Sequence, residues 1–350
     1  PRRHRPTELL PMPDYPTLLS TFHQYGAWLQ RLGISSVGLL NDAIEHDRYR
    51  EIVLISEALH EQRIAEIASL AAERADDLRV ILIAGPSSSG KTTFSKRLSV
   101  QLLAQGLSPF PIEMDNYFVD REFTPRDENG DYDFETIDAL NIQRLGEDVK
   151  RLTAWERVQL PRYDFITGKS IPGKVVQLRP GQIIILEGIH GLNPKLLPNF
   201  PAGSTFRIYV SALTQLNLDR HNRVSTTDTR LIRRIVRDAR TRGYSARDTI
   251  ARWESVRRGE KRYIFPYQEN ADAMFNSALV YELAALKPLA EPVLRQVPFG
   301  ADEHIEAKRL LSFLEWFLPM ESDFIPNNSI LREFTGGSGL KDFQVWQSAH

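Results

Sequence analysis

Arg79-Val-Ile-Leu-Ile-Ala84 leads directly into Gly85-Pro-Ser-Ser-Ser-Gly90-Lys91-Thr92-Thr93. The first stretch is a short, β-branched run of the kind that forms a buried parallel strand. The second fits the pattern G-x-x-x-x-G-K-[ST], and Phe94, Leu98 and Leu102 then recur at the spacing of one helix face. A strand, a glycine-rich loop and a helix in this order are typical of a phosphate-binding loop, or P-loop. The stretch therefore predicts an α/β fold that binds a nucleotide.

Each part of this loop has a physical task in binding a polyphosphate. Backbone N–H groups and the positive end of the helix attract the phosphates. Lys91 is expected to reach the β and γ phosphates, and the Thr92 hydroxyl is expected to ligate Mg²⁺. We therefore predict ATP and Mg²⁺ as cofactors. The predicted nucleotide-binding residues are Gly85, Ser87, Ser88, Ser89, Gly90, Lys91, Thr92 and Thr93.

Further strand-like runs alternate with helical patterns along the chain. They lie at residues 110–114, 183–186, 206–210 and 278–283. Strands that alternate with helices indicate a doubly wound parallel sheet with flanking helices. We expect three parts: a mainly helical N-terminal segment at 1–79 with a proline-rich lead-in, a P-loop domain at 80–297, and a C-terminal extension at 298–350. A helix near residues 303–318 and an irregular tail are expected in the extension.

The composition of the 350 residues excludes several classes of protein. With 42% hydrophobic and 25% charged residues the chain is globular, and its net charge of −1 favours neither nucleic acid nor membranes. The absence of cysteine excludes disulfides and thiolate chemistry and is compatible with a reducing cytoplasm. No apolar run is long enough to span a bilayer. We therefore predict a cytoplasmic protein.

We do not expect the N-terminal residues to form a signal peptide. Arg2, Arg3 and Arg5 are followed by prolines instead of the apolar run that a signal peptide needs. The chain begins with Pro1, which suggests a fragment or a processed product.

Two acidic residues follow predicted strands. Asp115 comes directly after the second strand, and Glu187 ends the run at 183–186. Because ligands bind at the carboxyl ends of parallel strands, both should lie near the P-loop. A carboxylate there can accept a proton from an attacking hydroxyl or hold Mg²⁺. The alternative for Asp115 is a helix N-cap, whereas an unpaired Glu187 would be costly to bury away from a metal.

The predicted helix at residues 228–240 separates into an apolar face and a basic face. The apolar face consists of Leu231, Ile232, Ile235, Val236 and Ala239, and the basic face of Arg230, Arg233, Arg234, Arg237 and Arg240. Solvated faces usually mix both signs of charge, and only Asp238 lies near these arginines, so we favour an anionic partner. The two alternatives are ATP phosphate, with the helix as a lid, and a nucleic-acid backbone.

Several strings together resemble the uridine kinase/phosphoribulokinase family of P-loop kinases over residues 80–297. They are Gly85–Thr93, Asp115-Asn-Tyr-Phe118, Asp131-Tyr-Asp-Phe-Glu135, Leu160-Pro-Arg-Tyr-Asp-Phe165, Glu187-Gly-Ile-His-Gly-Leu-Asn193 and the Thr227–Asp238 string. The chain is most similar to a bacterial uridine kinase-like branch whose longer members carry a threonyl-tRNA synthetase-like N-terminal region. Residues 37–73 and 325–334 also resemble that branch.

The resemblance implies a role for each matching residue. Asp115 matches the catalytic base that takes the proton from a nucleoside 5′-hydroxyl, and Asp133 matches the aspartate that holds ribose hydroxyls. The implied Mg²⁺ neighbourhood consists of Thr92, Asp115 and Glu187. The implied phosphate-clamping lid consists of Arg230, Arg233 and Arg237, which join Lys91 and Asp115 as catalytic candidates. Tyr163 and Phe165 match the base pocket, and Tyr117 is a further substrate-binding candidate.

One position departs from the family. Uridine kinases typically have a histidine three residues after the Tyr-Asp-Phe string, and this chain has Gly168. Gly168 supplies no side-chain donor, and shape alone discriminates weakly between ligands. We therefore expect strict recognition of the ribose through Asp133 and loose recognition of the base.

These observations predict ATP-dependent phosphorylation of the 5′-hydroxyl of uridine or another pyrimidine nucleoside. One alternative is a kinase for another small alcohol, such as a sugar phosphate or a vitamin precursor. The other is an NTP-gated RNA-binding module, which Asp115 and Asp133 disfavour. We predict a small-molecule nucleoside as the partner, disfavour nucleic acid and membranes, and find the sequence compatible with a homo-oligomer. Replacing the lid arginines should leave stability nearly unchanged, because they lie opposite the apolar face.

Overall fold

A five-stranded parallel sheet lies at the centre of the computed structural model, which describes residues 15–128, 130–198, 200–201 and 203–343. The predicted lead-in at residues 1–14 lies outside the described residues. The strands follow the order β2-β5-β1-β6-β7. Their bounds are β1 (Val80–Ala84), β2 (Ser108–Glu113), β5 (Gln182–Glu187), β6 (Thr205–Ser211) and β7 (Ala273–Asn276). This arrangement confirms the doubly wound α/β fold.

The side chains of β1 alternate between two hydrophobic clusters. Ile81 and Ile83 pack in one cluster and Val80 and Leu82 in the other, because successive side chains of a strand point to opposite faces. Burial on both faces explains why β1 reads as an uninterrupted apolar run. The first cluster includes helices α3 (Tyr49–Ala72), α4 (Lys91–Ala104), α6 (Thr226–Thr241), α7 (Ala246–Tyr263) and α8 (Glu282–Leu294), and the second includes α5 (Ile142–Thr153).

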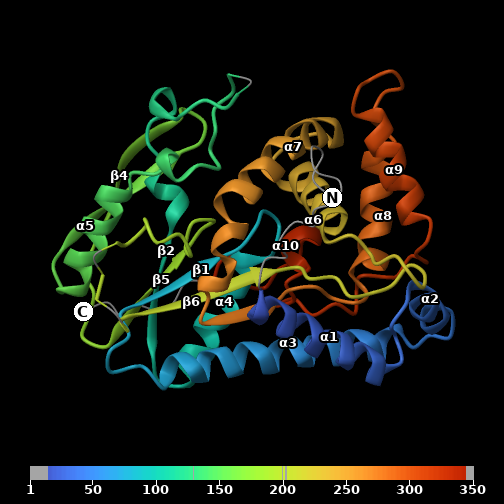
Figure 1. Cartoon of the computed structure of the whole chain (residues 1–350), viewed down its shortest axis with the longest axis horizontal. Helices are drawn as coiled ribbons and strands as arrows, with labels where there is room; N and C mark the ends of the chain where they lie inside the picture. Colours follow the sequence, from blue (N-terminus) through green and yellow to red (C-terminus); the bar gives the residue numbers. More distant parts are fainter. Residues whose placement is uncertain (1–14, 129, 199, 202, 344–350) are drawn as a thin grey trace, which may run out of the picture.

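The segments on either side of the P-loop region share the first cluster. The N-terminal segment contributes α1 (Pro16–Leu32), α2 (Val37–Glu45) and α3, and the C-terminal extension contributes α9 (His304–Leu314) and α10 (Arg332–Thr335). Figure 1 shows α3 running along one side of the sheet, with α5 at one end of the molecule and α9 at the other. Leu29, Ile64 and Phe334 are buried with Ile81, so these segments and the sheet form one core.

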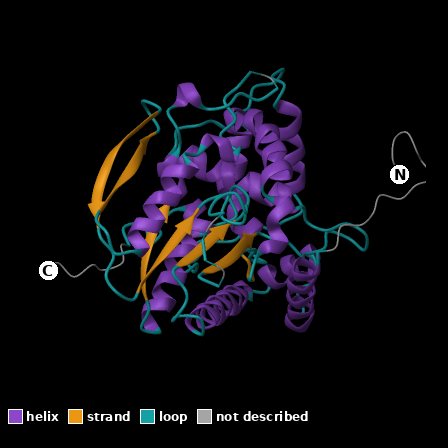
Figure 2. Cartoon of the chain, turned by 60° about the vertical axis from the view of Figure 1, so that its left-hand side comes forward, coloured by secondary structure: helices purple, strands orange, loops and turns teal. Residues whose placement is uncertain are grey.

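An antiparallel hairpin stands apart from the central sheet (Figure 2). It consists of β3 (Val158–Asp164) and β4 (Lys169–Val176), and the sequence analysis did not predict it. The remaining elements are the short 3-10 helices η1 (Met114–Tyr117), η2 (Arg121–Phe123), η3 (Ile137–Ala139) and η4 (Phe265–Asn270). In the part of the chain that the structure describes, no helix is both long and apolar enough to cross a membrane.

The prediction of a strand at residues 278–283 is wrong. The last strand, β7, ends at Asn276, and α8 begins at Glu282. The apolar character of the run reflects the burial of Leu279, Tyr281 and Leu283 in the first cluster. Burial alone does not distinguish a strand from a short buried loop and the start of a helix.

Candidate active site

The loop between β1 and α4 has the tight backbone of a P-loop. Ser88 and Gly90 adopt left-handed conformations, with φ angles of 58° and 84°. Gly90 must be a glycine because a Cβ atom there would also lie 2.5 Å from the Cγ2 of Ile330. The helix α4 begins at the next residue, Lys91, so the N–H groups of its first turn have no partner within the helix. The Lys91 Nζ atom folds back over the loop and donates to the Pro86 carbonyl at 3.2 Å.

A cleft of about 330 Å³ opens over this loop. The charged residues that line it are Lys91, Glu113, Asp115, Glu135, Glu187, Arg234, Arg237, Arg242 and Glu333. Asp115 lies in η1, directly after β2, and Glu187 is the last residue of β5. The predicted meeting of Lys91, Thr92, Asp115 and Glu187 at one edge of the sheet is therefore observed, as expected for the carboxyl ends of parallel strands.

Burial raises the pKa values of two acidic residues of the cleft. Burial raises the pKa of Glu187 to about 7, and the nearby carboxylate of Asp115 adds to this increase, while Lys91 opposes it. Burial also raises the pKa of Asp115, against the opposing charges of Lys91 and Arg242. A cation in the cleft would stabilise the ionised form of both side chains.

The oxygen atoms of this acidic group fit a hard divalent cation. The Thr92 hydroxyl donates to Glu187 Oε2 at 3.3 Å, and hydroxyl and carboxylate oxygens are ligands that Mg²⁺ prefers. Among the described residues, no three acidic or histidine side chains come close enough to hold a metal ion by themselves. Mg²⁺ usually keeps waters and phosphate oxygens in its coordination shell, so such a partial set of protein ligands is appropriate for it.

Three arginines approach the cleft from α6 and the residue that follows it. Arg234 Nη1 donates to Ser87 Oγ in the P-loop at 2.7 Å. Arg237 Nε donates to Asp238 at 2.9 Å, and Arg242 also lines the cleft. Arg237 therefore lies where the sequence predicted a phosphate-binding residue, whereas Arg234 and Arg242 were not chosen as site residues.

Arg230 and Arg233 do not line the cleft, and the expectation that they lie on an unpacked face is wrong. Arg230 is 2% exposed, and its two terminal nitrogens donate to Glu260, with Nη1 2.9 Å from Oε1. Arg233 is fully buried and pairs with Glu282. Because α7 and α8 each supply a carboxylate, Arg230 and Arg233 are packed within the protein and do not face an anionic partner, in contrast to the predicted lid.

These two buried ion pairs support the P-loop from behind. Glu260 Oε1 accepts the backbone N–H of Ser87 at 3.0 Å. Arg233 Nη1 donates to the carbonyl of Ser88 at 3.3 Å, and its Nη2 donates to the carbonyl of Ser277 at 2.8 Å. Arg230, which orients Glu260, and Arg233 are thus positioning residues for the loop.

The residues predicted to bind the acceptor lie beside the cleft. Asp133 is half-buried; its Oδ1 accepts the Glu135 N–H at 3.0 Å, and its Oδ2 accepts the Tyr263 hydroxyl at 3.4 Å. Glu135, two residues on, lines the cleft itself, and burial raises its pKa to about 7. Asp133 itself is not among the residues that line the cleft, so its contact with the acceptor stays a prediction.

An aromatic cluster adjoins the cleft. Phe118 lies at its centre, with ring centroids 5.6 Å from Phe134, 5.5 Å from Tyr163 and 6.4 Å from Phe165. Phe118 and Phe134 line the cleft, whereas Tyr163 and Phe165 are not among its lining residues. The predicted substrate-binding residue Tyr117 is a core residue instead: it is 1% exposed, and its hydroxyl donates to Asp148 at 3.1 Å.

Arg121 occupies the space beside Gly168. Gly168 lies in the turn between β3 and β4 with a φ of 69°, and a Cβ atom there would approach Arg121 Nε to 2.7 Å. Arg121 Nη2 donates to the carbonyl of Phe165 at 2.7 Å, while Arg162 and Lys169 are exposed. No sequence pattern identified Arg121 as a site residue. The one available signal was Gly168, whose missing side chain leaves room for the Arg121 side chain.

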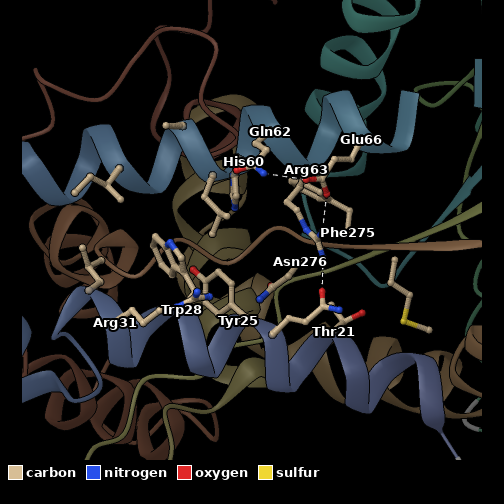
Figure 3. Close-up of a pocket in the computed structure, with 16 residues that line it drawn as sticks. Thr21, Tyr25, Trp28, Arg31, His60, Gln62, Arg63, Glu66, Phe275 and Asn276 are labelled. Carbon is tan, nitrogen blue, oxygen red and sulfur yellow. Dashed lines mark hydrogen bonds and ion pairs between the residues drawn. The ribbon is translucent and has the colours of Figure 1, made fainter. Parts of the chain in front are cut away.

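A second cavity is larger than this cleft. It measures about 700 Å³ and lies between α1 and α3 beside β7 (Figure 3). Tyr25, Trp28 and His60 line it. Arg63 on α3 donates to Gln24 on α1, which links the two helices, and also pairs with Glu66 on its own helix. It shares no lining residue with the cleft over the P-loop. Its larger volume is therefore no evidence that phosphate transfer takes place there.

Comparisons with known proteins find similarity to uridine kinases. The uridine kinase of Ligilactobacillus salivarius (strain UCC118) is 30% identical over 194 residues, which cover 55% of this chain and 82% of that protein. The uridine kinase of Saccharomyces cerevisiae is 25% identical over 231 residues, which cover 65% of this chain and 42% of that protein. A solved structure described as a possible uridine kinase from Bacillus stearothermophilus is 21% identical, with a TM-score of 0.38 over 59% of this chain and 98% of that chain.

The family assignment rests on a match over more than half of the chain. The profile of the Phosphoribulokinase / Uridine kinase family matches residues 80–284. This range includes the P-loop, Asp115, Glu187 and the whole of α6. The chain therefore belongs to the phosphoribulokinase/uridine kinase family and is an ATP-dependent kinase.

Proposed function

We propose that the chain transfers the γ-phosphoryl group of ATP to the 5′-hydroxyl of a nucleoside, with uridine or another pyrimidine nucleoside as the acceptor. The observation that carries this proposal is the meeting of Lys91, Asp115, Glu187 and Arg237 in one cleft over the P-loop. The relatives named uridine kinase, which are 30% and 25% identical to the chain, support the choice of a nucleoside.

The basic residues of the cleft neutralise the phosphates. Lys91 meets the β and γ phosphates, and Arg234, Arg237 and Arg242 line the same cleft. Charge on the transferring group is spread over its oxygens, so fixed positive groups around it stabilise the transition state. This assignment keeps Arg237 in the predicted lid and replaces Arg230 and Arg233 by Arg234 and Arg242.

Thr92, Asp115 and Glu187 are the residues that would hold Mg²⁺. The ion, when bound, neutralises charge on the β and γ phosphates. The raised pKa values of Asp115 and Glu187 support this assignment, because both side chains would gain a counter-charge.

Asp115 is the proposed general base. Asp115 lines the cleft. Partial removal from water raises its pKa, which makes the carboxylate a better proton acceptor. The proton of the acceptor hydroxyl passes to Asp115 while the oxygen attacks the γ-phosphorus, and ADP leaves. Lys91 and Arg242 keep Asp115 ionised enough to act.

Asp133 and the aromatic cluster are the proposed acceptor site. The Asp133 carboxylate can accept hydrogen bonds from two neighbouring ribose hydroxyls. Phe118 and Phe134 offer ring faces on which a base can stack, and Arg121 borders Gly168 and donates to the carbonyl of Phe165, a member of this cluster. Its guanidinium carries donors for the carbonyl oxygens of a pyrimidine, so Arg121 is the candidate for reading the base.

An ADP-release assay over a panel of acceptors tests this function. We expect turnover with uridine and cytidine and none with sugar phosphates, vitamin precursors or RNA. Turnover with a sugar phosphate alone, or RNA binding without turnover, would favour one of the two alternatives. Asp133→Ala should lower kcat/KM for all nucleosides alike, whereas Arg121→Ala should lower it by about tenfold for pyrimidine nucleosides only.

A further inference from the structure

The C-terminal extension packs directly on the P-loop and α4, although it lies outside the range that the family profile matches. Ile330 fills the space beside Gly90 that a side chain would otherwise take. Lys96 Nζ, on α4, donates to the carbonyls of Leu340 and Lys341 at 2.7 and 2.9 Å. Segments far apart in the sequence therefore form one surface around the start of α4.

Glu333, in α10, reaches the first turn of α4 from this extension. Its Oε2 accepts the backbone N–H of Thr93 at 3.1 Å and the Thr93 hydroxyl at 2.9 Å. Thr93 is the third residue of the helix, so its N–H has no partner within α4. Glu333 is also one of the charged residues that line the cleft.

In a P-loop the N–H groups at the start of the helix are donors to phosphate oxygens. One N–H cannot donate a good hydrogen bond to a carboxylate and to a phosphate in the same place. We propose that Glu333 occupies a phosphate position of the nucleotide site, so that ATP must displace its carboxylate from Thr93 to bind. This inference rests on the proposed nucleotide site and deepens it, because it makes Glu333 a determinant of nucleotide affinity.

Contacts with α6 hold Glu333 in this place. Arg240 Nε and Nη2 donate to the carbonyls of Phe334 and Glu333 at 3.1 and 3.2 Å. The Arg233 guanidinium lies 5.0 Å from the centre of the Phe334 ring. The backbone of α10 is therefore attached to the same helix that carries the cleft residues Arg234 and Arg237.

The charge of Glu333 opposes the binding of a polyphosphate in a second way. It adds a negative group to a cleft that already holds Glu113, Asp115 and Glu187. Displacing the carboxylate removes both hydrogen bonds that Thr93 donates to it, and a carboxylate that stays nearby repels the phosphates. Both contributions weaken the affinity for ATP and neither acts on the acceptor nucleoside.

Calorimetric titration of the full chain with ATP and Mg²⁺ tests the proposal. Glu333→Gln and Glu333→Ala should bind ATP more tightly, by about tenfold or more for the alanine variant, since a hydrogen bond to a charged group is lost from the free state only. Arg240→Ala should shift the affinity in the same direction by less. Glu315→Gln, an exposed residue that follows α9, is the matched control and should leave the affinity unchanged.

Unchanged or weaker ATP binding in both Glu333 variants would overturn the proposal. Glu333→Gln retains the size and an acceptor oxygen, so it decides the matter if the alanine variant melts at a lower temperature.

Lys91→Ala separates this outcome from a failure of the proposed function. If Lys91→Ala leaves ATP binding intact, the nucleotide site is elsewhere; if it abolishes binding while the Glu333 variants behave like the wild type, only the inference about Glu333 fails. The KM for the nucleoside should not change in any Glu333 variant.

Discussion

The charged residues around the P-loop form two sets, one buried behind the loop and the other facing the cleft. Behind the loop each arginine meets one carboxylate: Arg230 pairs with Glu260, and Arg233 pairs with Glu282. In the cleft, Asp115 and Glu187 have no such one-to-one arginine partner among the described residues, although burial raises the pKa values of the carboxylates in both sets. The charges behind the loop are therefore paired within the protein, whereas Asp115 and Glu187 can still pair with a cation.

The difference separates two functions that the same helix carries. Arg230 and Arg233 lie on α6 beside Arg234 and Arg237, yet only the latter two line the cleft. Removing a partner from a buried pair leaves an uncompensated charge, which mainly costs stability. Removing a charged residue of the cleft breaks no buried one-to-one pair, so it mainly costs activity. Substitutions in the two sets should therefore have opposite signatures.

Asp115→Asn should have the largest effect on activity. The amide cannot accept the proton of the acceptor hydroxyl, so we expect kcat to fall by about 10²–10⁴-fold. Steady-state kinetics measure this loss. Thermal melting should show that stability is retained, because the variant no longer has a carboxylate that burial makes costly to ionise. ATP binding should stay near that of the wild type, in contrast to Lys91→Ala, which should lose both affinity and turnover. Full activity of the variant would exclude Asp115 as the base.

Arg230→Ala should have the largest effect on stability. It leaves Glu260 buried without its partner, and breaking a buried pair in this way costs about 3–5 kcal/mol. Urea denaturation measures the loss. The matched control is Arg257→Ala, which breaks a surface pair with Glu254 on the same α7 and should cost about 1 kcal/mol or less. Equal costs for the two variants would contradict the distinction between buried and exposed pairs.

Arg237→Ala should lower kcat by about 10²–10³-fold, the range found when one fixed donor to transition-state charge is removed. The KM for the nucleoside should change less than kcat, since the charge on the phosphates is what Arg237 meets. Asp238 keeps Arg234 and Arg242 as partners at 3.3 and 3.6 Å, so the melting temperature should stay nearly constant. A raised KM at constant kcat would place Arg237 outside the reacting centre.

The parts of the fold that depend on neighbouring residues were predictable. The strand, loop and helix from Val80 to Ala104 follow from local patterns, and so does the meeting of Asp115 and Glu187 with the P-loop, because parallel strands end at one edge. The hairpin of β3 and β4 was missed because Pro161 and Pro172 interrupt its strand patterns. The run at 278–283 was misassigned because a short buried apolar run has no diagnostic period.

The burial of the arginines was not predictable from α6 alone. The helical wheel identifies which side chains share a face, but what covers that face is determined elsewhere in the chain. Glu260 lies 30 residues beyond Arg230, and Glu282 lies 49 residues beyond Arg233. Glu333 is more distant still, 240 residues from Thr93. Residues whose role depends on one partner far along the chain carry no periodic signal, so only the folded structure identifies them.

Glu135→Gln should have the smallest effect and should sharpen the contrast between the two sets through pH. Burial raises the pKa of Glu135 from its ordinary value near 4.5 to about 7, Glu260 and Asp133 add to the increase, and Arg234 and Lys91 oppose it. Between these two values the folded state holds a proton that the unfolded state has released, so this group makes stability fall as pH rises from 4.5 to about 7.

The glutamine variant has no carboxyl proton to lose. Its melting temperature should therefore depend less on pH across this window, and above it the variant should be more stable than the wild type by about 1 kcal/mol or less, because water in the open cleft screens the charge. Thermal melting over this pH range measures both changes, with Glu254→Gln on the exposed surface of α7 as the control that should leave the profile as it is. A variant that is less stable than the wild type above pH 7 would show that the Glu135 carboxylate is balanced within the fold, as the buried pairs are, and does not belong to the unbalanced set of the cleft.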